Sequence, residues 1–173
     1  MTENKIILET KRLVLRNWTN ADCDALFEIM RDADVVRYIA DGKPFTFEKV
    51  REFLTWAEVY ERENGVCRWK VIERSSGEII GSCGFARPHE TDEIELGYLL
   101  AQKHWGKGFA TEITKAVALY GFNKLGFREI IAMTDLENIA SQKVLEKIGF
   151  QKRGIELFNG EESLVYIKKK SDE

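Results

Sequence analysis

The sequence has few of the residues that build disulfide frameworks and metal sites. Its three cysteines, Cys23, Cys67 and Cys83, form no CxxC pair, and only His89 and His104 accompany them. An odd number of widely spaced cysteines fits buried, reduced thiols better than a set of disulfides. We therefore expect a reducing compartment and no metal site.

Long apolar segments and a strong charge imbalance are also missing. No stretch approaches the roughly 20 apolar residues that span a bilayer, and the opening MTENKIILETKR contains no apolar signal region. The formal net charge is −3, so the basic footprint of a nucleic-acid-binding protein is lacking. We expect a cytoplasmic protein with neither a membrane nor a nucleic-acid partner.

Breaks in the chain are equally scarce. Only two prolines occur among the 173 residues, and neither a low-complexity linker nor an internal repeat is visible. A chain of this length can bury roughly two-thirds of its unfolded surface in one core. Residues 1–173 are therefore predicted to form a single domain.

Hydrophobic spacing and turn signals predict a mixed α/β fold. Alternation marks strands, apolar positions at helical spacing mark helices, and Asn159-Gly160 marks a tight hairpin turn. We expect about seven strands in one central sheet, with helices on both faces. The expected order is a strand (12–18), helices (19–31 and 46–64), a hairpin (66–87), a strand (92–100), a helix ending around 121–126, a strand (128–135), a helix (137–150) and a C-terminal hairpin (150–170).

The loop Gly106-Lys107-Gly108 lies between a predicted strand and a predicted helix. Backbone N–H groups of such a loop and of the first helical turn can converge on a phosphate. A P-loop requires GxxxxGK[ST], which fails because Gly108 follows the lysine. A dinucleotide fingerprint fits weakly, because Thr111 stands at its last position and only one strand–helix–strand unit follows.

Several separated segments favour another interpretation. EIELGYLL (93–100), WGKGFATE (105–112) and DLENIASQKVLEKIGFQKRG (135–154), in this order, resemble the GNAT superfamily of acetyl-CoA-dependent N-acetyltransferases. The opening LETKRLVLRNWTNADCDALFEI (8–29) is similar to the RimJ/RimL-like branch, which acetylates protein N-termini among other amines. The resemblance covers nearly the whole chain and implies a GNAT-like domain that uses acetyl-CoA and an amine acceptor.

The resemblance also assigns residues to the cofactor. It places the pyrophosphate on backbone amides of the loop, and it implies a splay between the two strands that flank the glycine-loop helix. Amides near the end of the preceding strand then point at the thioester carbonyl, and Gly97 permits a bulge there. The cofactor-binding residues expected on this basis are Tyr98, Leu99, Leu100, Trp105, Gly106, Lys107, Gly108, Phe109, Ala110, Thr111, Asn138 and Ser141.

Catalytic groups are expected on the strand before the loop and on the helix that follows it. Glu95 is the candidate general base, directly or through a water, and Glu93 is the runner-up on the same face. A carboxylate that is merely solvated, or that only fixes the substrate, is the alternative. Ser141 stands where the branch places a hydroxyl that protonates the leaving thiolate, and Asn138 where it binds the cofactor arm. Asn138 could instead only cap the helix, and Ser141 could merely cap it or face solvent.

The predicted reaction is direct attack of an amine on acetyl-CoA in a ternary complex. A protein N-terminal α-amine is the favoured acceptor, because its pKa of about 7.7–8.0 makes deprotonation easier than for lysine near 10.4. A polyamine, an amino acid, an aminoglycoside, a non-catalytic CoA sensor and a nucleotide-binding protein are the alternatives. The protein is expected to be a monomer or a homodimer.

Overall fold

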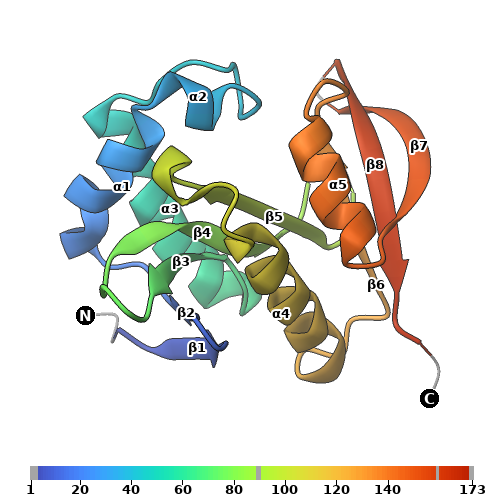
Figure 1. The fold of residues 1–173 in the computed structure, drawn as a ribbon, viewed down its shortest axis with the longest axis horizontal. Helices are drawn as coiled ribbons and strands as arrows, with labels where there is room; N and C mark the ends of the chain where they lie inside the picture. Colours follow the sequence, from blue (N-terminus) through green and yellow to red (C-terminus); the bar gives the residue numbers. More distant parts are fainter. Residues whose placement is uncertain (1–3, 89–90, 159, 172–173) are drawn as a thin grey trace.

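The computed structural model describes residues 4–88, 91–158 and 160–171. Within these residues, eight strands form one sheet in the order β1-β2-β3-β4-β5-β6-β8-β7 (Figure 1). The strands are β1 (Ile6–Glu9), β2 (Leu13–Arg16), β3 (Arg68–Glu73), β4 (Ile79–Ala86), β5 (Glu95–Leu100), β6 (Glu129–Thr134), β7 (Gln151–Phe158) and β8 (Glu161–Lys169). The helices are α1 (Cys23–Met30), α2 (Ala33–Val36), α3 (Phe47–Asn64), α4 (Phe109–Asn123) and α5 (Ile139–Lys147), with short 3-10 helices η1 (Asn20–Asp22) and η2 (Gln102–His104).

The sheet is divided into two parts by its one parallel neighbour pair. All other neighbouring strands in the described residues run antiparallel, whereas β5 and β6 are parallel and share a single register pair, Glu95 with Ile131. Beyond this pair the two strands diverge. The predicted splay is therefore present, and it opens toward the C-terminal end of β5.

Helices cover both faces of the sheet, as predicted. Trp69 and Lys70 are neighbours on β3, so their side chains point to opposite faces. The Trp69 ring packs edge-on against Tyr120 of α4, with centroids 6.1 Å apart. Lys70 instead pairs with Asp22, which ends η1 just before α1, at 2.7 Å. Helix α4 thus lies on one face, and η1 with α1 lies on the other.

Local signals set the ends of the longest helix. Thr46 caps α3 by accepting a hydrogen bond from the Lys49 backbone N–H at 3.2 Å. Gly65 ends the helix in the left-handed conformation, with φ of 72°, which a residue without Cβ adopts at little cost. Both signals were read correctly from the sequence, since they depend only on neighbouring residues.

One strand and two short helical segments, α2 and the 3-10 helix η2, were not predicted. β1 adds a strand beside β2, so the sheet has eight strands in place of about seven. It spans only four residues, too few for alternation to distinguish it from a loop. The short helix α2 occupies residues 33–36, where no element was expected. Asn159 of the predicted hairpin turn lies outside the described residues, but β7 and β8 do pair antiparallel.

Candidate active site

The glycine loop joins β5 to α4 through η2. Gly106 and Gly108 have φ of 73° and 80°, in the left-handed region that disfavours residues with a Cβ. A Cβ at Gly106 would meet nothing within 4 Å, so the main chain there is open on that side. Gly108 is also the N-cap residue of α4, so the turn directs the start of the helix into the loop.

The loop and the first turn of α4 present a row of unpaired amides. From Gly106 to Thr111, the backbone N–H groups donate no hydrogen bond to any described residue, and the first helical bond is Glu112 N–H to the Gly108 carbonyl at 3.1 Å. Free amides at a helix N-terminus carry partial positive charge and bind phosphate oxygens. The donors are therefore main-chain groups. The Phe109 side chain, within this segment, is buried in the core.

Arg12 fixes the loop from a distant part of the chain. Its Nη1 donates to the Lys107 carbonyl oxygen at 2.9 Å, and its guanidinium lies 4.5 Å from the Phe109 ring centroid. Its Nε pairs with Glu112 at 2.7 Å. Arg12 begins the predicted strand 12–18, and its contact with the loop was not predicted from the sequence. Because 95 residues separate it from Lys107, no local pattern links the two.

Glu112 is held by several donors at the start of α4. Thr10 Oγ1 donates to its Oε1 at 2.7 Å, and the Arg12 backbone N–H donates to the same oxygen at 3.0 Å. Burial raises the pKa of Glu112, but these hydrogen bonds and Arg12 outweigh burial and hold the pKa below its usual value. The charged carboxylate therefore ties α4 to the turn between β1 and β2.

Trp105 lies at the entrance of the loop. Its indole Nε1 donates to the Leu100 carbonyl oxygen at 2.8 Å, while 48% of the residue surface is exposed. The hydrogen bond fixes the indole against the end of β5. An exposed aromatic face is thereby kept beside the free amides.

The end of β5 directs amides into the splay. Ala101 N–H donates to the Ile80 carbonyl at 2.8 Å, so antiparallel alternation turns the N–H of Leu99 toward β4. The N–H groups of Tyr98 and Leu100 then point the other way, where β6 has diverged. Of the three predicted residues, two therefore present amides to the gap, and Leu99 presents its amide to β4.

The bulge predicted at Gly97 is absent. The pairing of β4 with β5 runs without a register shift from Gly81–Leu100 to Ala86–Glu95, and Gly97 lies directly opposite Gly84. The prediction was wrong because the glycine serves another purpose. A Cβ at Gly97 would come within 2.6 Å of Arg68 Cζ, so the glycine gives room to that guanidinium.

Asn138 and Ser141 lie at the N-terminal end of α5, beside Tyr98 of β5. Asn138 caps the helix, accepting a hydrogen bond on Oδ1 from the Ser141 N–H at 3.1 Å. Tyr98 Oη donates to Ser141 Oγ at 3.3 Å, which brings the two hydroxyls together. Burial raises the pKa of Tyr98, more than the Ser141 hydrogen bond lowers it, so the phenol is protonated at neutral pH.

Glu95 faces away from this pair of hydroxyls. It is two residues from Gly97 on β5 and shares that face with Arg68, whereas Tyr98 lies on the opposite face. Arg68 Nη2 donates to Glu95 Oε2 at 2.7 Å, and the Glu95 side chain is 12% exposed. Among the described residues Oε1 has no hydrogen-bond partner, and it is not sealed from solvent.

Glu93, the runner-up, is engaged elsewhere. It lies before β5 and pairs with Arg153 of β7, whose Nη2 donates at 3.1 Å. Hydrogen bonding from Arg153 outweighs burial and holds the pKa of Glu93 below its usual value. This geometry joins β7 to the start of β5 and leaves Glu93 a weaker proton acceptor.

Cysteine and metal chemistry find no support in the described residues. Burial raises the pKa of Cys67 to about 12 and raises that of Cys83 as well, so neither thiol is a ready nucleophile. No group of three His, Cys, Asp or Glu side chains that could hold a metal occurs in the described part of the chain. His89 lies outside it, while His104 is buried. No described helix is long and apolar enough to cross a bilayer.

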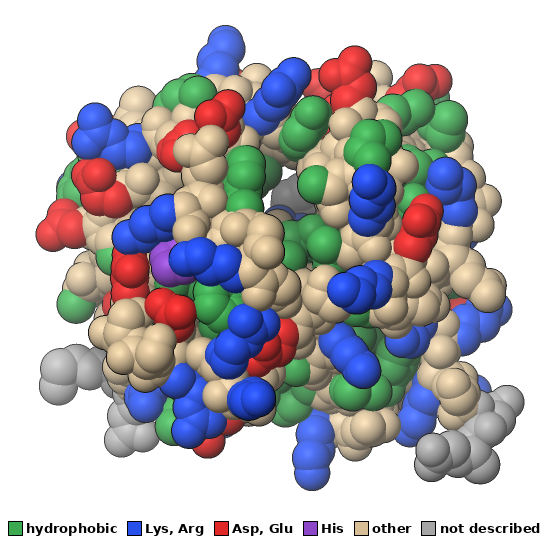
Figure 2. Space-filling model, in the orientation of Figure 1, with side chains coloured by type: hydrophobic (Ala, Val, Ile, Leu, Met, Phe, Trp, Pro, Cys, Tyr) green, Lys and Arg blue, Asp and Glu red, His purple; other side chains and the backbone are tan. Residues whose placement is uncertain are grey.

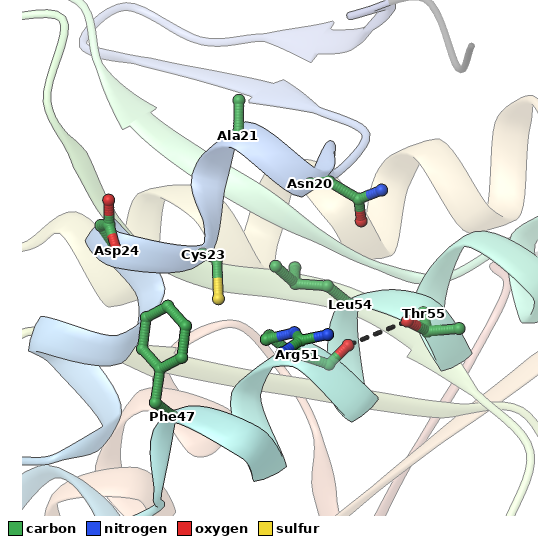
Figure 3. Close-up of a pocket in the computed structure, with 8 residues that line it drawn as sticks. All are labelled: Asn20, Ala21, Cys23, Asp24, Phe47, Arg51, Leu54 and Thr55. Carbon is green, nitrogen blue, oxygen red and sulfur yellow. Dashed lines mark hydrogen bonds between the residues drawn. The ribbon is translucent and has the colours of Figure 1, made fainter.

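A separate pocket of about 550 Å³ lies between η1–α1 and α3 (Figure 3). Its lining residues are Asn20, Ala21, Cys23, Asp24, Phe47, Arg51, Leu54 and Thr55. None of them belongs to the glycine loop, to β5 or to α5. The pocket is thus distinct from the groups described above.

Comparison with known proteins agrees with this arrangement. The acetyltransferase (GNAT) domain family matches residues 12–151. The chain belongs to the GNAT acetyltransferases. It is 37% identical over 151 residues to the uncharacterized N-acetyltransferase YoaA of Bacillus subtilis, covering 86% of this chain and 85% of that protein.

Solved GNAT structures share the fold. A GNAT-family acetyltransferase from Bacillus anthracis superposes with a TM-score of 0.80 at 27% identity, covering 95% of this chain and 98% of the other. RimL, a ribosomal L7/L12 α-N-protein acetyltransferase solved with coenzyme A, gives 0.81 at 16% identity, covering 95% and 98%. At that identity RimL is evidence for the fold alone. This GNAT protein is accordingly an N-acetyltransferase.

The residues of this GNAT site fit acetyl-CoA, the acetyl donor of the family. Six free amides in a row offer donors for a pyrophosphate, and the splay offers two more beside it. Figure 2 shows a hollow between the part of the surface over β5 and α4 and the part over α5, with hydrophobic side chains around it. Such a hollow suits an extended, largely apolar arm.

Proposed function

We propose that this protein acetylates the α-amine of a protein or peptide N-terminus, with acetyl-CoA as donor. One observation carries the proposal: Glu95 and the Tyr98–Ser141 pair lie on opposite faces of β5, at the point where β6 diverges. A proton acceptor and a proton donor therefore flank one gap from its two sides. Acyl transfer from a thioester to an amine uses both groups, the acceptor near the nitrogen and the donor near the sulfur.

The cofactor is bound by main-chain amides in this proposal. The amides of Gly106 to Thr111 hold the pyrophosphate, with the exposed face of Trp105 beside them. The amides of Tyr98 and Leu100 lie along the splay, where they stabilise the oxygen that becomes negative during attack. Asn138 uses Oδ1 in its cap, so its side-chain N–H group is the part left to donate to the cofactor arm.

Proton transfers occur at two atoms of the chain. Glu95 Oε1 takes the proton of the acceptor ammonium, and the freed amine attacks the thioester carbonyl carbon. As the carbon–sulfur bond breaks, the attacking nitrogen, which became positive on attack, loses its second proton to solvent, and the Ser141 hydroxyl gives its proton to the sulfur. Tyr98 Oη, already donating to Ser141, replaces that proton and regains one from solvent. The products are an N-acetyl amide, free CoA and one proton.

Local charge favours an α-amine over a polyamine. On the Glu95 face of the sheet, Glu95 is balanced by Arg68, and Asp22 is balanced by buried Lys70. A site without excess negative charge does not attract a polycation. An α-amine, with a pKa of about 7.7–8.0, is partly neutral at physiological pH. RimL, whose fold this protein shares, is an α-N-protein acetyltransferase of ribosomal L7/L12, and the proposed acceptor is of the same class.

The test is a screen of acceptors for thiol release from acetyl-CoA. Peptides with a free N-terminus are compared with the same peptides blocked at the N-terminus but carrying a lysine, and with spermidine, free amino acids and an aminoglycoside. We expect turnover only with the peptides that have a free N-terminus, and mass spectrometry should place the acetyl group on their α-amine. Preferential turnover of a small amine would show that the proposed acceptor is wrong and that the small amine is the substrate. Absence of turnover with every amine would favour a CoA sensor.

A further inference from the structure

The Arg68 side chain is held against the main chain of β5. A Cβ on Gly97 would approach Arg68 Cζ to 2.6 Å and both Nε and Nη2 to 2.7 Å, so the guanidinium occupies the space that a side chain would need. The backbone of Arg68 is fixed as well, because Trp18 Nε1 donates to its carbonyl oxygen at 2.7 Å. The orientation of Arg68 is thus set on both its backbone and its side chain.

This position carries an energetic cost. Arg68 Nε is buried without a hydrogen-bond partner among the described residues, and an unpaired buried donor destabilises a fold. The compensating contact is the Nη2 hydrogen bond to Glu95 Oε2 at 2.7 Å. An unpaired buried donor of this kind is expected at a functional site, where the geometry serves something other than stability.

No neighbouring cation can substitute for Arg68. Lys70, the next basic residue on the same face of β3, is 2% exposed and pairs with Asp22 at 2.7 Å. Asp22 is further fixed by the Thr19 backbone N–H and hydroxyl, at 2.7 and 2.8 Å. Glu95 therefore depends on Arg68 alone, among the described residues, for its orientation.

We infer that Arg68 is a positioning residue for the transfer reaction: it holds Glu95 Oε2 so that Oε1 alone faces the incoming amine. The inference rests on the proposed role of Glu95 as the base. Gly97 belongs to the same device, since it provides the space in which the guanidinium lies. In this role Arg68 acts through Glu95 and not directly on the reacting atoms.

Three variants test this inference in the full-length protein. Arg68→Met removes the guanidinium, Arg68→Lys keeps the charge without the two-nitrogen fork, and Gly97→Ala pushes the guanidinium aside while keeping Arg68. Arg62→Met, on the exposed surface of α3, is the control. We expect kcat to fall on the order of 10- to 100-fold in the three test variants, as for a displaced catalytic group. The dissociation constant of acetyl-CoA, from titration calorimetry, should change less than about 2-fold because the free amides are untouched.

Two further measurements separate positioning from a structural role. In a Glu95→Gln background, adding Arg68→Met should lower kcat no further, because the oriented group is already lost. Guanidinium ion at millimolar concentration should restore part of the activity of Arg68→Ala, whereas urea at equal concentration should not. If Arg68→Met lowered kcat by the same factor in the Glu95→Gln background as in the unsubstituted protein, the inference would be overturned. Equal rescue of Arg68→Ala by urea and by guanidinium ion would also overturn it.

The outcomes for Arg68 and Glu95 can be told apart. If Glu95→Gln alone leaves kcat unchanged, the proposed base is wrong, whatever Arg68 does. If Glu95→Gln slows the reaction but Arg68→Met and Gly97→Ala do not, only the positioning role fails. Should Arg68→Met not fold, Gly97→Ala decides the question, because its backbone has no positive φ and the displaced atoms belong to the end of a flexible side chain.

Discussion

Tyr98 Oη donates a hydrogen bond to Ser141 Oγ at 3.3 Å, and this bond joins β5 to α5 beside the gap where β6 diverges from β5. The two residues are 43 positions apart in the chain. Two hydroxyls in contact form a path along which a proton can move toward a leaving thiolate. Ser141 alone was predicted to act as the proton donor.

Removing either hydroxyl should slow the chemical step. Ser141→Ala is expected to lower kcat by about 10²-fold, within the usual contribution of general acid catalysis. Tyr98→Phe should lower it less, since the serine hydroxyl remains. Both variants should retain the dissociation constant for acetyl-CoA, because the main-chain amides are unchanged. Single-turnover kinetics with a peptide acceptor would measure the step, and an unaltered rate in Ser141→Ala would show that the proton comes from another group.

A side chain at Gly108 should abolish cofactor binding. Gly108→Glu would place a carboxylate beside the unpaired amides of the loop, where a phosphate is expected. Gly126→Glu is a matched control, because Gly126 has φ of 75° against 80° for Gly108 and its Cβ would meet no atom within 4 Å. Both substitutions cost about 1–2 kcal/mol in backbone strain.

Calorimetric titration with acetyl-CoA distinguishes these two variants. Gly108→Glu should show no measurable binding while its thermal unfolding stays cooperative, and Gly126→Glu should bind like the unsubstituted protein. Normal binding by Gly108→Glu would place the cofactor elsewhere.

Two carboxylates close in sequence should behave differently on neutralisation. Glu95→Gln is expected to lower kcat by about 10²-fold with little change in acetyl-CoA affinity, because a proton acceptor is lost. Glu93→Gln should leave kcat within about 2-fold but weaken the link to Arg153 of β7, which lowers stability by roughly 1 kcal/mol. Steady-state rates and urea unfolding of both variants measure this. The reverse pattern would make Glu93 the base.

The carboxylate of Glu112 should make stability depend on pH. Its pKa is lowered in the folded protein, so its stabilising contribution is present at pH values above the pKa of the unfolded chain and is lost as the pH falls through the folded value. Glu112→Gln should therefore cost about 1 kcal/mol at pH 7, and the difference from the unsubstituted protein should shrink below about pH 4.

Urea unfolding at several pH values would measure this dependence. Glu129→Gln, which breaks a more exposed pair with Lys169, is the control and should have little effect at either pH. A difference for Glu112→Gln that stayed constant down to pH 3 would mean that packing, and not charge, explains its effect.

Local signals made much of the fold predictable. Thr46 and Gly65 mark the ends of α3 through contacts within four residues, and Gly106 and Gly108 marked a loop in which both glycines have positive φ. The splay of β5 and β6 beyond the Glu95–Ile131 pair was inferred from resemblance to a family, because the spacing of residues in one strand does not reveal that its neighbour diverges. The roles assigned to Glu95, Asn138 and Ser141 stay predictions.

Contacts between distant segments were beyond the sequence. Arg12 lies 95 residues from Lys107 and Arg68 lies 27 residues from Glu95, yet the first supports the glycine loop and the second pairs with Glu95. Neither contact leaves a periodic trace, because each depends on how strands are ordered in the sheet. Gly97 was recognised as special but was assigned a bulge, since a missing side chain does not reveal what fills its space.

The alternation of β5 divides its six residues between two tasks. Its odd-numbered side chains face the Glu95 side and its even-numbered ones the α4 side. Under the proposed mechanism, substitutions of the odd-numbered side chains should alter which amine is accepted without disturbing how the acetyl donor is held. A short strand of this kind lets evolution change one partner of a two-substrate enzyme and preserve the other.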